Sequence, residues 1–355
     1  MKISLKEVSL FSLFILLALT LSLSGAYGLA GSYPPTPPCG PALPPNGPAL
    51  PATGISITVG TGPSFLAFDS HLNEIFVGNW NECSGTTVSV ISDATDKVVA
   101  TITVQPGPFT LAFDSHNNKV YVANCVSNAV SVISDATNKV IKVITGFNYP
   151  DGVAFDSNLN EIFVANGLGN TVSVISDSTN TVIKTIPTPG PPEGFPSPTG
   201  AAFDPHNGEV YVANTGYYGG GYTVTVISDS TNTVIKTIPV GWDAFQVAYD
   251  SNNNEVYVTN AASGTVSVIS DSTNTVVKTI SVQAFPYGVA FDSHNNYVYV
   301  ANSGSYSLSV ISDATNIVTQ TITGFTFPYG IVFDPHTNQL FVTNYALNTV
   351  SVIPG

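Results

Sequence analysis

The histidines are the first side chains to consider for chemistry, because neutral imidazole is a frequent metal ligand. Asn158 and Asn252 lie two residues after an aspartate that recurs along the chain, and all five histidines take the same place in other copies of the pattern: His71, His116, His206, His294 and His336. Each histidine is therefore predicted to occupy the same turn of a separate repeat. Packed sheets lie about 10 Å apart, whereas a metal holds its ligand nitrogens at about 2 Å. We therefore expect turn residues, with no metal site and no cofactor.

The acidic side chains recur just as regularly. Repeated aspartates such as Asp292 and Asp313 are expected to accept hydrogen bonds from backbone amides in tight turns, because one active site does not need a copy in every repeat. The Ser-Asp-x-Thr-Asn turns lack the dense carboxylates of a strong calcium site. No Gly-rich phosphate loop, Gly-x-Ser-x-Gly elbow or His-Glu-x-x-His string occurs. With no catalytic constellation, we expect that the protein is not an enzyme.

A repeat positions all of these residues. Seven times an aspartate that follows an aromatic residue is itself followed by an asparagine ten residues later. The pairs are Asp69 and Asn79, Asp114 and Asn124, Asp156 and Asn166, Asp204 and Asn214, Asp250 and Asn260, Asp292 and Asn302, and Asp334 and Asn344. Each unit holds four runs rich in Val, Ile, Tyr, Phe and Thr, which in the sixth unit are 288–291, 297–301, 308–311 and 317–322. Four short strands in a unit of about 42 residues predict an all-β, seven-bladed β-propeller of four-stranded antiparallel blades.

The repeat also carries a family resemblance. Four of the seven asparagines end a Tyr-Val-Ala-Asn or Tyr-Val-Thr-Asn string, and residues 257–260 read Tyr-Val-Thr-Asn. Over residues 55–353 the chain resembles the YVTN β-propeller repeats of archaeal surface-layer-like proteins and bacterial periplasmic relatives. The resemblance implies a secreted or cell-surface binding scaffold. The alternative is a propeller hydrolase or lyase, lactonase-like or streptogramin-lyase-like, because a fold does not determine a function.

The last repeat has no fourth strand of its own, because the sequence reaches only the third strand at residues 350–353. Residues 55–60 match the fourth strand of the other repeats. Ile57 lies twelve residues before Asp69, as Ile238 lies twelve residues before Asp250. We therefore expect the N-terminal strand to complete the C-terminal blade, which closes the ring and pairs a sheet edge that would otherwise be open.

Length varies in only two kinds of connection, those between second and third strands and those between blades. In an up-down-up-down blade both emerge on one face, and variable loops on a rigid scaffold commonly bind partners. Aromatic side chains there suit a glycan or a protein partner, although each could instead pack between blades or line the axis. The binding candidates are Trp80, Phe195, Tyr217, Tyr218, Tyr222 and Trp242, and the same face should also carry Tyr149, Phe285, Tyr287, Phe327, Tyr329 and Tyr345, with the charged groups Glu82, Asp151, Glu193 and Asp243.

The charge balance bears on partners and habitat. Nine lysine and arginine residues face 23 aspartate and glutamate residues, which gives a net charge of −14. Such a surface repels phosphate backbones, so we expect no nucleic-acid partner. Few basic groups also keep the surface from becoming strongly cationic at low pH, which suggests an acidic habitat.

The N-terminus is typical of an exported protein. Lys2 and Lys6 precede an uncharged apolar run over residues 8–23, and Ser-Gly-Ala follows at residues 24–26. This order predicts a signal peptide over residues 1–26, with an uncleaved anchor as the alternative and as the only link to a membrane. A proline-rich linker over residues 27–54 then leads to the propeller at 55–355.

Three cysteines in an exported chain suggest one disulfide. Cys83 and Cys125 fall between the second and third strands of adjacent blades, on the same face, and Cys39 lies in the linker. We predict that Cys83 pairs with Cys125, which requires their Cα atoms to lie within about 7 Å.

Overall fold

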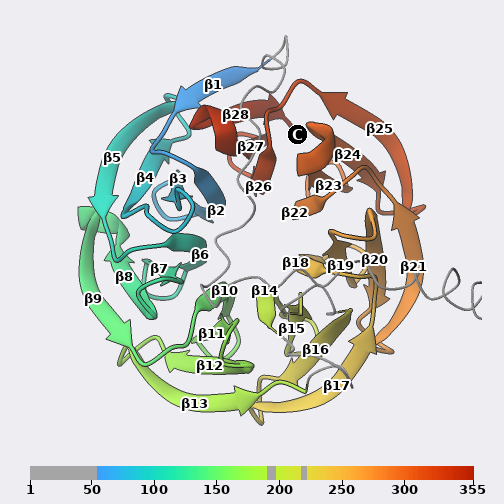
Figure 1. Cartoon of the computed structure of the whole chain (residues 1–355), viewed down its shortest axis with the longest axis horizontal. Helices are drawn as coiled ribbons and strands as arrows, with labels where there is room; N and C mark the ends of the chain where they lie inside the picture. The colour runs from blue at the N-terminus through green and yellow to red at the C-terminus, as the bar shows by residue number, and fades with distance from the viewer. Residues whose placement is uncertain (1–53, 190–196, 217–221) are drawn as a thin grey trace, which may run out of the picture. The chain divides into compact units, whose positions relative to one another are not determined.

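The computed structural model describes residues 54–189, 197–216 and 222–355, which contain seven antiparallel sheets of four strands (Figure 1). Sheets 1 to 3 are β2 (Pro63–Asp69), β3 (Glu74–Asn79), β4 (Thr87–Ser92) and β5 (Lys97–Thr103); β6 (Pro108–Asp114), β7 (Lys119–Asn124), β8 (Ala129–Ser134) and β9 (Lys139–Thr145); and β10 (Pro150–Asp156), β11 (Glu161–Asn166), β12 (Thr171–Ser176) and β13 (Thr181–Pro187). Sheets 4 and 5 are β14 (Pro198–Asp204), β15 (Glu209–Asn214), β16 (Thr223–Ser228) and β17 (Thr233–Pro239); and β18 (Ala244–Asp250), β19 (Glu255–Asn260), β20 (Thr265–Ser270) and β21 (Thr275–Ser281). Sheet 6 is β22 (Pro286–Asp292), β23 (Tyr297–Asn302), β24 (Ser307–Ser312) and β25 (Ile317–Thr323), and sheet 7 is β26 (Pro328–Asp334), β27 (Gln339–Asn344), β28 (Thr349–Pro354) and β1 (Ile55–Thr58).

The remaining regular structure is three single 3-10 turns within the described ranges: η1 (Asp135–Thr137), η2 (Ser303–Ser305) and η3 (Tyr345–Leu347). No helix in the described ranges is long and apolar enough to cross a membrane.

The first strand of each sheet is an inner strand, and the seven inner strands surround a common axis (Figure 1). Each inner strand contacts the next around the ring, and β26 contacts β2, so the ring is closed. The prediction of a seven-bladed propeller is confirmed.

The sheets pack face to face, which explains why the second strands are apolar along nearly their whole length. Between sheets 1 and 2, Phe76 and Val88 of one sheet meet Val120 and Ile133 of the other, and all four side chains are fully buried. Each sheet is covered on both sides by its neighbours, so the alternation of apolar and polar residues typical of a half-exposed strand is lost. Solvent therefore meets mainly the connections and the outer strands, where few charges suffice.

The N-terminal strand completes sheet 7, as predicted. Strand β1 pairs antiparallel with β28, placing Ile57 opposite Val350. Ile57 is buried, and it packs in one cluster with Phe341 of its own sheet and Ile75 of sheet 1. Closure thus joins apolar burial to backbone pairing at an edge that would otherwise be open.

The two faces of the ring differ, also as predicted. The turn face carries the connections after first and third strands, and each has four residues, as at 70–73 and 93–96. The insertion face carries the connections after second strands and between sheets. The longer connections at 80–86, 188–197 and 215–222 all lie there.

Candidate functional site

Aromatic side chains from distant sheets meet at the axis on the insertion face. They stand at the starts of inner strands or just after second strands. We call them the aromatic cluster: Phe65, Trp80, Phe109, Phe245, Tyr287, Tyr329 and Tyr345. Convergence follows from the topology, because all inner strands begin on this face.

The rings contact one another across the ring of sheets. The centroid of Phe245 from sheet 5 lies 6.2 Å from that of Phe65 in sheet 1 and 6.5 Å from that of Phe109 in sheet 2. Tyr287 lies 4.7 Å from Phe245 and 4.9 Å from Tyr329, in tilted arrangements. These separations are typical of favourable aromatic pairs. Phe65 and Phe109 are buried, whereas Phe245, Tyr287 and Tyr329 keep part of their surface exposed.

Two carboxyl groups accompany the cluster. Asp151 is the second residue of β10 and is only 8% exposed, and its Oδ1 has no hydrogen-bond partner among the described residues. Burial raises the pKa of Asp151 from its ordinary value of 3.8 to about 7. Asp243, just before β18, has its pKa raised by burial to about 6. In both groups burial shifts the equilibrium toward the neutral form, and no cation nearby offsets that shift.

These carboxyl groups contribute to the raised pKa values of two tyrosines. Burial, and then the charge of Asp243, raise the pKa of Tyr287 to about 12. Burial likewise raises the pKa of Tyr329 well above its ordinary value, with further contributions from Tyr287 and Asp151. Asp151 takes the same second place in β10 that Tyr287 and Tyr329 take in β22 and β26, and Asp243 directly precedes β18, so both carboxyl groups belong to the same end of the axis as the tyrosines.

Two further aromatic side chains on this face point into solvent. Trp242 is 63% exposed and Phe285 is 52% exposed. Their connections are fixed by hydrogen bonds, since Trp242 N donates to Ser263 Oγ (2.8 Å) and Phe285 O accepts from Ser303 N (2.9 Å).

Phe285 also has an unusual backbone conformation. The residue before each inner strand has a positive φ in all seven sheets. Gly62 and Gly107 fill that place before β2 and β6, but Phe285 has a φ of +50°. Its ring lies against Gly304, where an added Cβ would come within 2.6 Å of Phe285 Cδ2. A bulky residue in the left-handed region costs free energy that glycine avoids.

The predicted binding residues have different outcomes. Trp80 is buried in the aromatic cluster at 7% exposure, and Trp242 is exposed. Tyr222 is partly exposed and accepts a hydrogen bond on its backbone oxygen from Val240 N (2.7 Å). Phe195, Tyr217 and Tyr218 lie outside the described residues.

Three members of the cluster were not among the predicted face residues: Phe65, Phe109 and Phe245. They follow the first residue of an inner strand by one or two positions. Phe109 and Phe245 lie five residues before their repeat aspartates, as Tyr287 and Tyr329 do, and this shared spacing is a usable sequence signal.

The predicted disulfide between Cys83 and Cys125 is wrong. Cys125 carries a free thiol that is buried in the cluster, while Cys83 is disulfide-bonded. Burial raises the pKa of the Cys125 thiol to about 12. Sharing a face was not sufficient: Cys125 is buried in the cluster and Cys83, partly buried, packs against the same cluster with its Sγ 3.9 Å from Tyr149 Oη, yet the two form no disulfide with each other. Cys39 lies outside the described residues.

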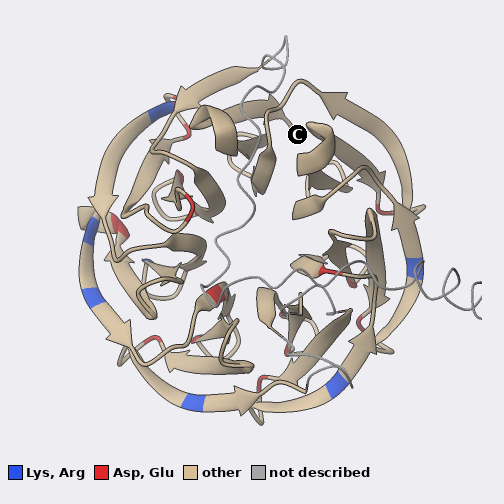
Figure 2. Cartoon of the chain, in the orientation of Figure 1, with Lys and Arg blue, Asp and Glu red and all other residues tan. Residues whose placement is uncertain are grey.

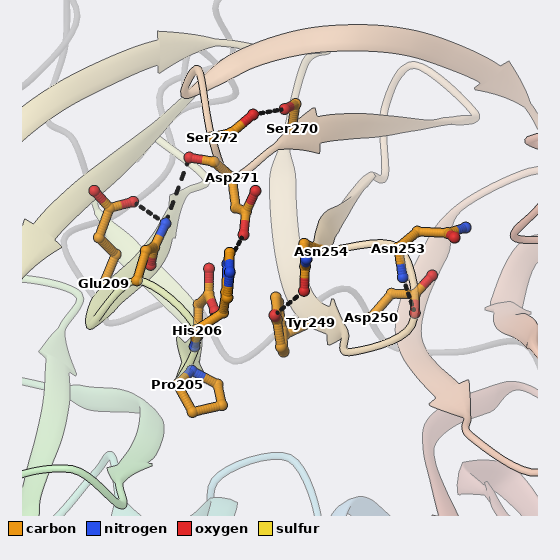
Figure 3. Close-up of polar contacts among 12 residues, drawn as sticks. Pro205, His206, Glu209, Tyr249, Asp250, Asn253, Asn254, Ser270, Asp271 and Ser272 are labelled. Atoms are coloured by element: carbon orange, nitrogen blue, oxygen red, sulfur yellow. Dashed lines mark hydrogen bonds and ion pairs between the residues drawn. The ribbon is translucent and has the colours of Figure 1, made fainter.

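On the turn face, histidines form hydrogen bonds to aspartates of the neighbouring sheet, and we call these contacts latches. His206 Nδ1 lies 2.8 Å from Asp271 Oδ2 of the next sheet, with the imidazole directed at the carboxylate (Figure 3). Three more such pairs are His71 with Asp135, His116 with Asp177, and His336 with Asp93, at 2.6–2.7 Å. Asn252 makes the equivalent bond to Asp313. The histidines therefore do reach across the gap between neighbouring sheets, because the turns project toward each other.

The repeated aspartates hold these turns, as predicted. Asp204 Oδ1 accepts a hydrogen bond from His206 N (2.8 Å), and Asp250 Oδ1 accepts one from Asn252 N (2.8 Å). Asp250 Oδ1 also accepts from Asn253 N (3.3 Å; Figure 3). Two groups place three ligand atoms within 4.8 Å of one another: Asp114, His116 and Asp177, and Asp204, His206 and Asp271. In both groups His Nδ1 already shares a hydrogen bond with an aspartate, and the same contact recurs in other sheets. The role of these groups in joining neighbouring sheets therefore explains why their side chains lie so close together.

The tyrosine and asparagine of the repeated string have structural roles as well. Tyr257 Oη donates to Asn316 Oδ1 (2.6 Å) in the following sheet. Asn260 Nδ2 donates to Ser267 Oγ (3.0 Å) within its own sheet, and every other repeat asparagine reaches a hydroxyl at the same place in its third strand. The residues of this string therefore form hydrogen bonds that hold each blade together and join it to the next blade.

Not every junction has such a latch. Between sheets 3 and 4, Asn158 Nδ2 donates instead to Pro205 O (3.4 Å). Sheet 7 takes its fourth strand from β1, so it has no turn between third and fourth strands to receive His294 or Tyr299 of sheet 6. Tyr299 Oη instead accepts from Asn295 Nδ2 (3.0 Å) in its own sheet. Apolar packing joins sheets 6 and 7, together with a hydrogen bond that Ser303 Oγ donates to Pro328 O.

Comparison with known proteins agrees with the fold. The YNCE-like beta-propeller family matches residues 244–353. A solved structure titled Kuenenia stuttgartiensis hydrazine synthase is 18% identical, with a TM-score of 0.73, and the match covers 84% of this chain and 97% of that chain. At that identity the similarity shows the fold alone. None of the curated proteins matches the chain.

Proposed function

We propose that this chain is an exported binding scaffold that holds a protein partner or a glycan at the cell surface through its insertion face. The β-propeller fold supports a binding or scaffold role in general, and the proposal adds that the insertion face is the surface that binds. The turn face has uniform connections occupied by latches, which leaves the insertion face as the surface free to vary between proteins.

The exposed ring of Phe285 carries the proposal. A half-exposed phenylalanine in a left-handed conformation is disfavoured for stability, because glycine fits the same place in sheets 1 and 2. Tyr149 and Phe327 have the same left-handed conformation in sheets 3 and 7, so the exposure of its ring is what distinguishes Phe285. Trp242 adds a second exposed ring on a fixed connection, and rings held in place lose little entropy on binding.

The proposed location rests on the sequence. Lys2 and Lys6, the apolar run over residues 8–23 and the small residues at 24–26 support export. The Tyr-Val-Thr-Asn strings are similar to those of surface-layer-like proteins, which supports a place at the cell surface. A proline-rich linker would hold the propeller away from a membrane or a cleavage site.

Binding is preferred over the hydrolase or lyase alternative because of the charged groups available. Within the described part of the insertion face these are Glu82, Asp151 and Asp243, with no lysine or histidine beside them. An acid–base pair of unlike groups, which such chemistry usually needs, is not formed there. Turnover of a lactone or streptogramin substrate at a rate that Asp151→Asn abolishes would favour the alternative.

The test is capture from a cell-envelope fraction and on a glycan array. Trp242→Ala with Phe285→Gly should reduce capture at least tenfold, because two exposed rings each contribute about 1 kcal/mol or more at an interface. His294→Asn is the matched control, since asparagine occupies the same turn in sheets 3 and 5. Equal capture by all three proteins, or no capture on either platform, would contradict the proposal.

A further inference from the structure

Three partly exposed rings of the aromatic cluster share their end of the axis with two carboxyl groups. Phe245, Tyr287 and Tyr329 are in mutual contact, with centroids 4.7–6.1 Å apart. Asp151 is the second residue of its inner strand, as these three rings are of theirs, and it lies in the same shift of pairing register; Asp243 directly precedes the strand of Phe245. Ring faces carry partial negative charge, so rings and carboxylates here present the same sign to a ligand.

No basic side chain neutralises this site within the described ranges. Six of the seven described lysines lie on the outer strands, and Lys119 begins β7 at the turn face (Figure 2). The histidines also lie on the turn face, where four of them pair with aspartates. A ligand that reaches the rings therefore meets aromatic surface and acidic groups without a competing cation of the protein.

Asp151 adds a specific requirement. Its side chain is more than nine-tenths buried, and Oδ1 accepts no hydrogen bond from the described residues. A buried acceptor without a donor costs about 1–3 kcal/mol. A quaternary ammonium would satisfy its charge but not its hydrogen-bonding capacity, whereas a protonated amine carries N–H donors as well.

We propose, building on the binding role of the insertion face, that Phe245, Tyr287 and Tyr329 together with Asp151 and Asp243 bind a protonated amine of the ligand. The ammonium lies against the ring faces and donates to Asp151 Oδ1, and Asp243 adds negative charge at the same end of the axis. Cation–π attraction is worth about 0.5–2 kcal/mol, and an ion pair gains strength where water is excluded. An amino sugar and a lysine side chain both present this group.

The test compares charged and neutral partners of the same shape by calorimetry or NMR near neutral pH. One pair is glucosamine with N-acetylglucosamine, and the other is lysine amide with its Nε-acetylated form. We expect the charged member of one pair to bind about tenfold or more tightly than its neutral counterpart, and the pair that shows this identifies the source of the amine.

Variants then assign the preference to the site. Asp151→Asn should remove it, Asp243→Asn should reduce it about threefold or more, and His294→Asn should leave it unchanged, with thermal melts to show that each variant folds. Equal binding within both pairs, or a preference that survives both aspartate substitutions, would overturn the amine site. Envelope capture that depends on Trp242 and Phe285 but shows no amine preference would overturn this inference alone and leave the binding role intact.

Discussion

Replacing Asp151 by asparagine should change how stability depends on pH. Asp151 is buried and its pKa is raised by burial to about 7 from an ordinary value of 3.8. Because the folded state holds this proton more tightly than the unfolded state, the wild type loses stability as pH rises from about 4 to about 7. Three pKa units at 1.36 kcal/mol each correspond to about 4 kcal/mol. The asparagine variant has no such proton to lose.

The measurement is urea unfolding of both proteins from about pH 4 to pH 8. The unfolding free energy of the variant minus that of the wild type should increase by about 4 kcal/mol as pH rises across that range. Unmatched hydrogen bonds of the buried amide shift this difference by a constant but do not change its slope. Glu82→Gln is the control, because it removes an exposed carboxyl from the same face. A difference that stays flat with pH, or equal slopes for both variants, would refute the assignment of a buried, unpaired acid at the axis.

Four further outcomes are expected. Deleting residues 55–58 should lower Tm by roughly 10 °C, because Ile57 loses its burial and sheet 7 its fourth strand; an unchanged melt would contradict closure by β1. Differential scanning fluorimetry should find that His206→Ala lowers Tm while His294→Ala does not, since only His206 has an aspartate partner in the next sheet; equal effects would argue against the latches. In the same assay Phe285→Gly should leave Tm unchanged or raise it, because the positive φ favours glycine, and a clear loss would mean that the ring serves stability. Non-reducing peptide mapping should find Cys125 as a thiol that alkylates only after unfolding and Cys83 in a disulfide; a peptide joining the two would contradict the structure.

The direction of several pKa shifts determines how stability changes with pH. Burial raises the pKa of Asp69, Asp114 and Asp204, and the bond to Asp271 raises that of His206. In each case the folded state binds its proton more tightly than the unfolded state, so stability increases as pH falls through the raised pKa values. This agrees in sign with the expectation of an acidic habitat.

Much of the fold could be predicted because its determinants are local and repeated. The constant distance from Asp69 to Asn79 and its six counterparts sets strand and turn positions, and Ile57 shares the spacing of the other fourth strands. Which connections vary in length could also be counted, and alternation of strand direction then assigns them to one face.

The site could be predicted only in part, because it depends on distances between residues from different sheets. The contact of Phe245 with Phe65 joins sheets that are not neighbours, and a shift in pairing register at the start of each inner strand aims the side chains. Sequence spacing carries no information about either. The prediction for the cysteines failed for the same reason, since a shared face does not bring two thiols within bonding distance.

The histidines show how an average distance can mislead. A spacing of about 10 Å describes the cores of packed sheets, but His206 and Asp271 lie in turns that extend beyond the sheets and meet at 2.8 Å. The repeat made the histidines recognisable as turn residues, while their partners became evident only in the structure.

The most direct test of the insertion face as the binding surface is hydrogen–deuterium exchange with and without a bound cell-envelope fraction. Peptides over 240–247 and 282–287, which contain Trp242, Phe245, Phe285 and Tyr287, should become protected, and turn-face peptides over 251–254 and 293–296 should not change. Protection confined to the turn face, or to the outer strands, would contradict the assignment.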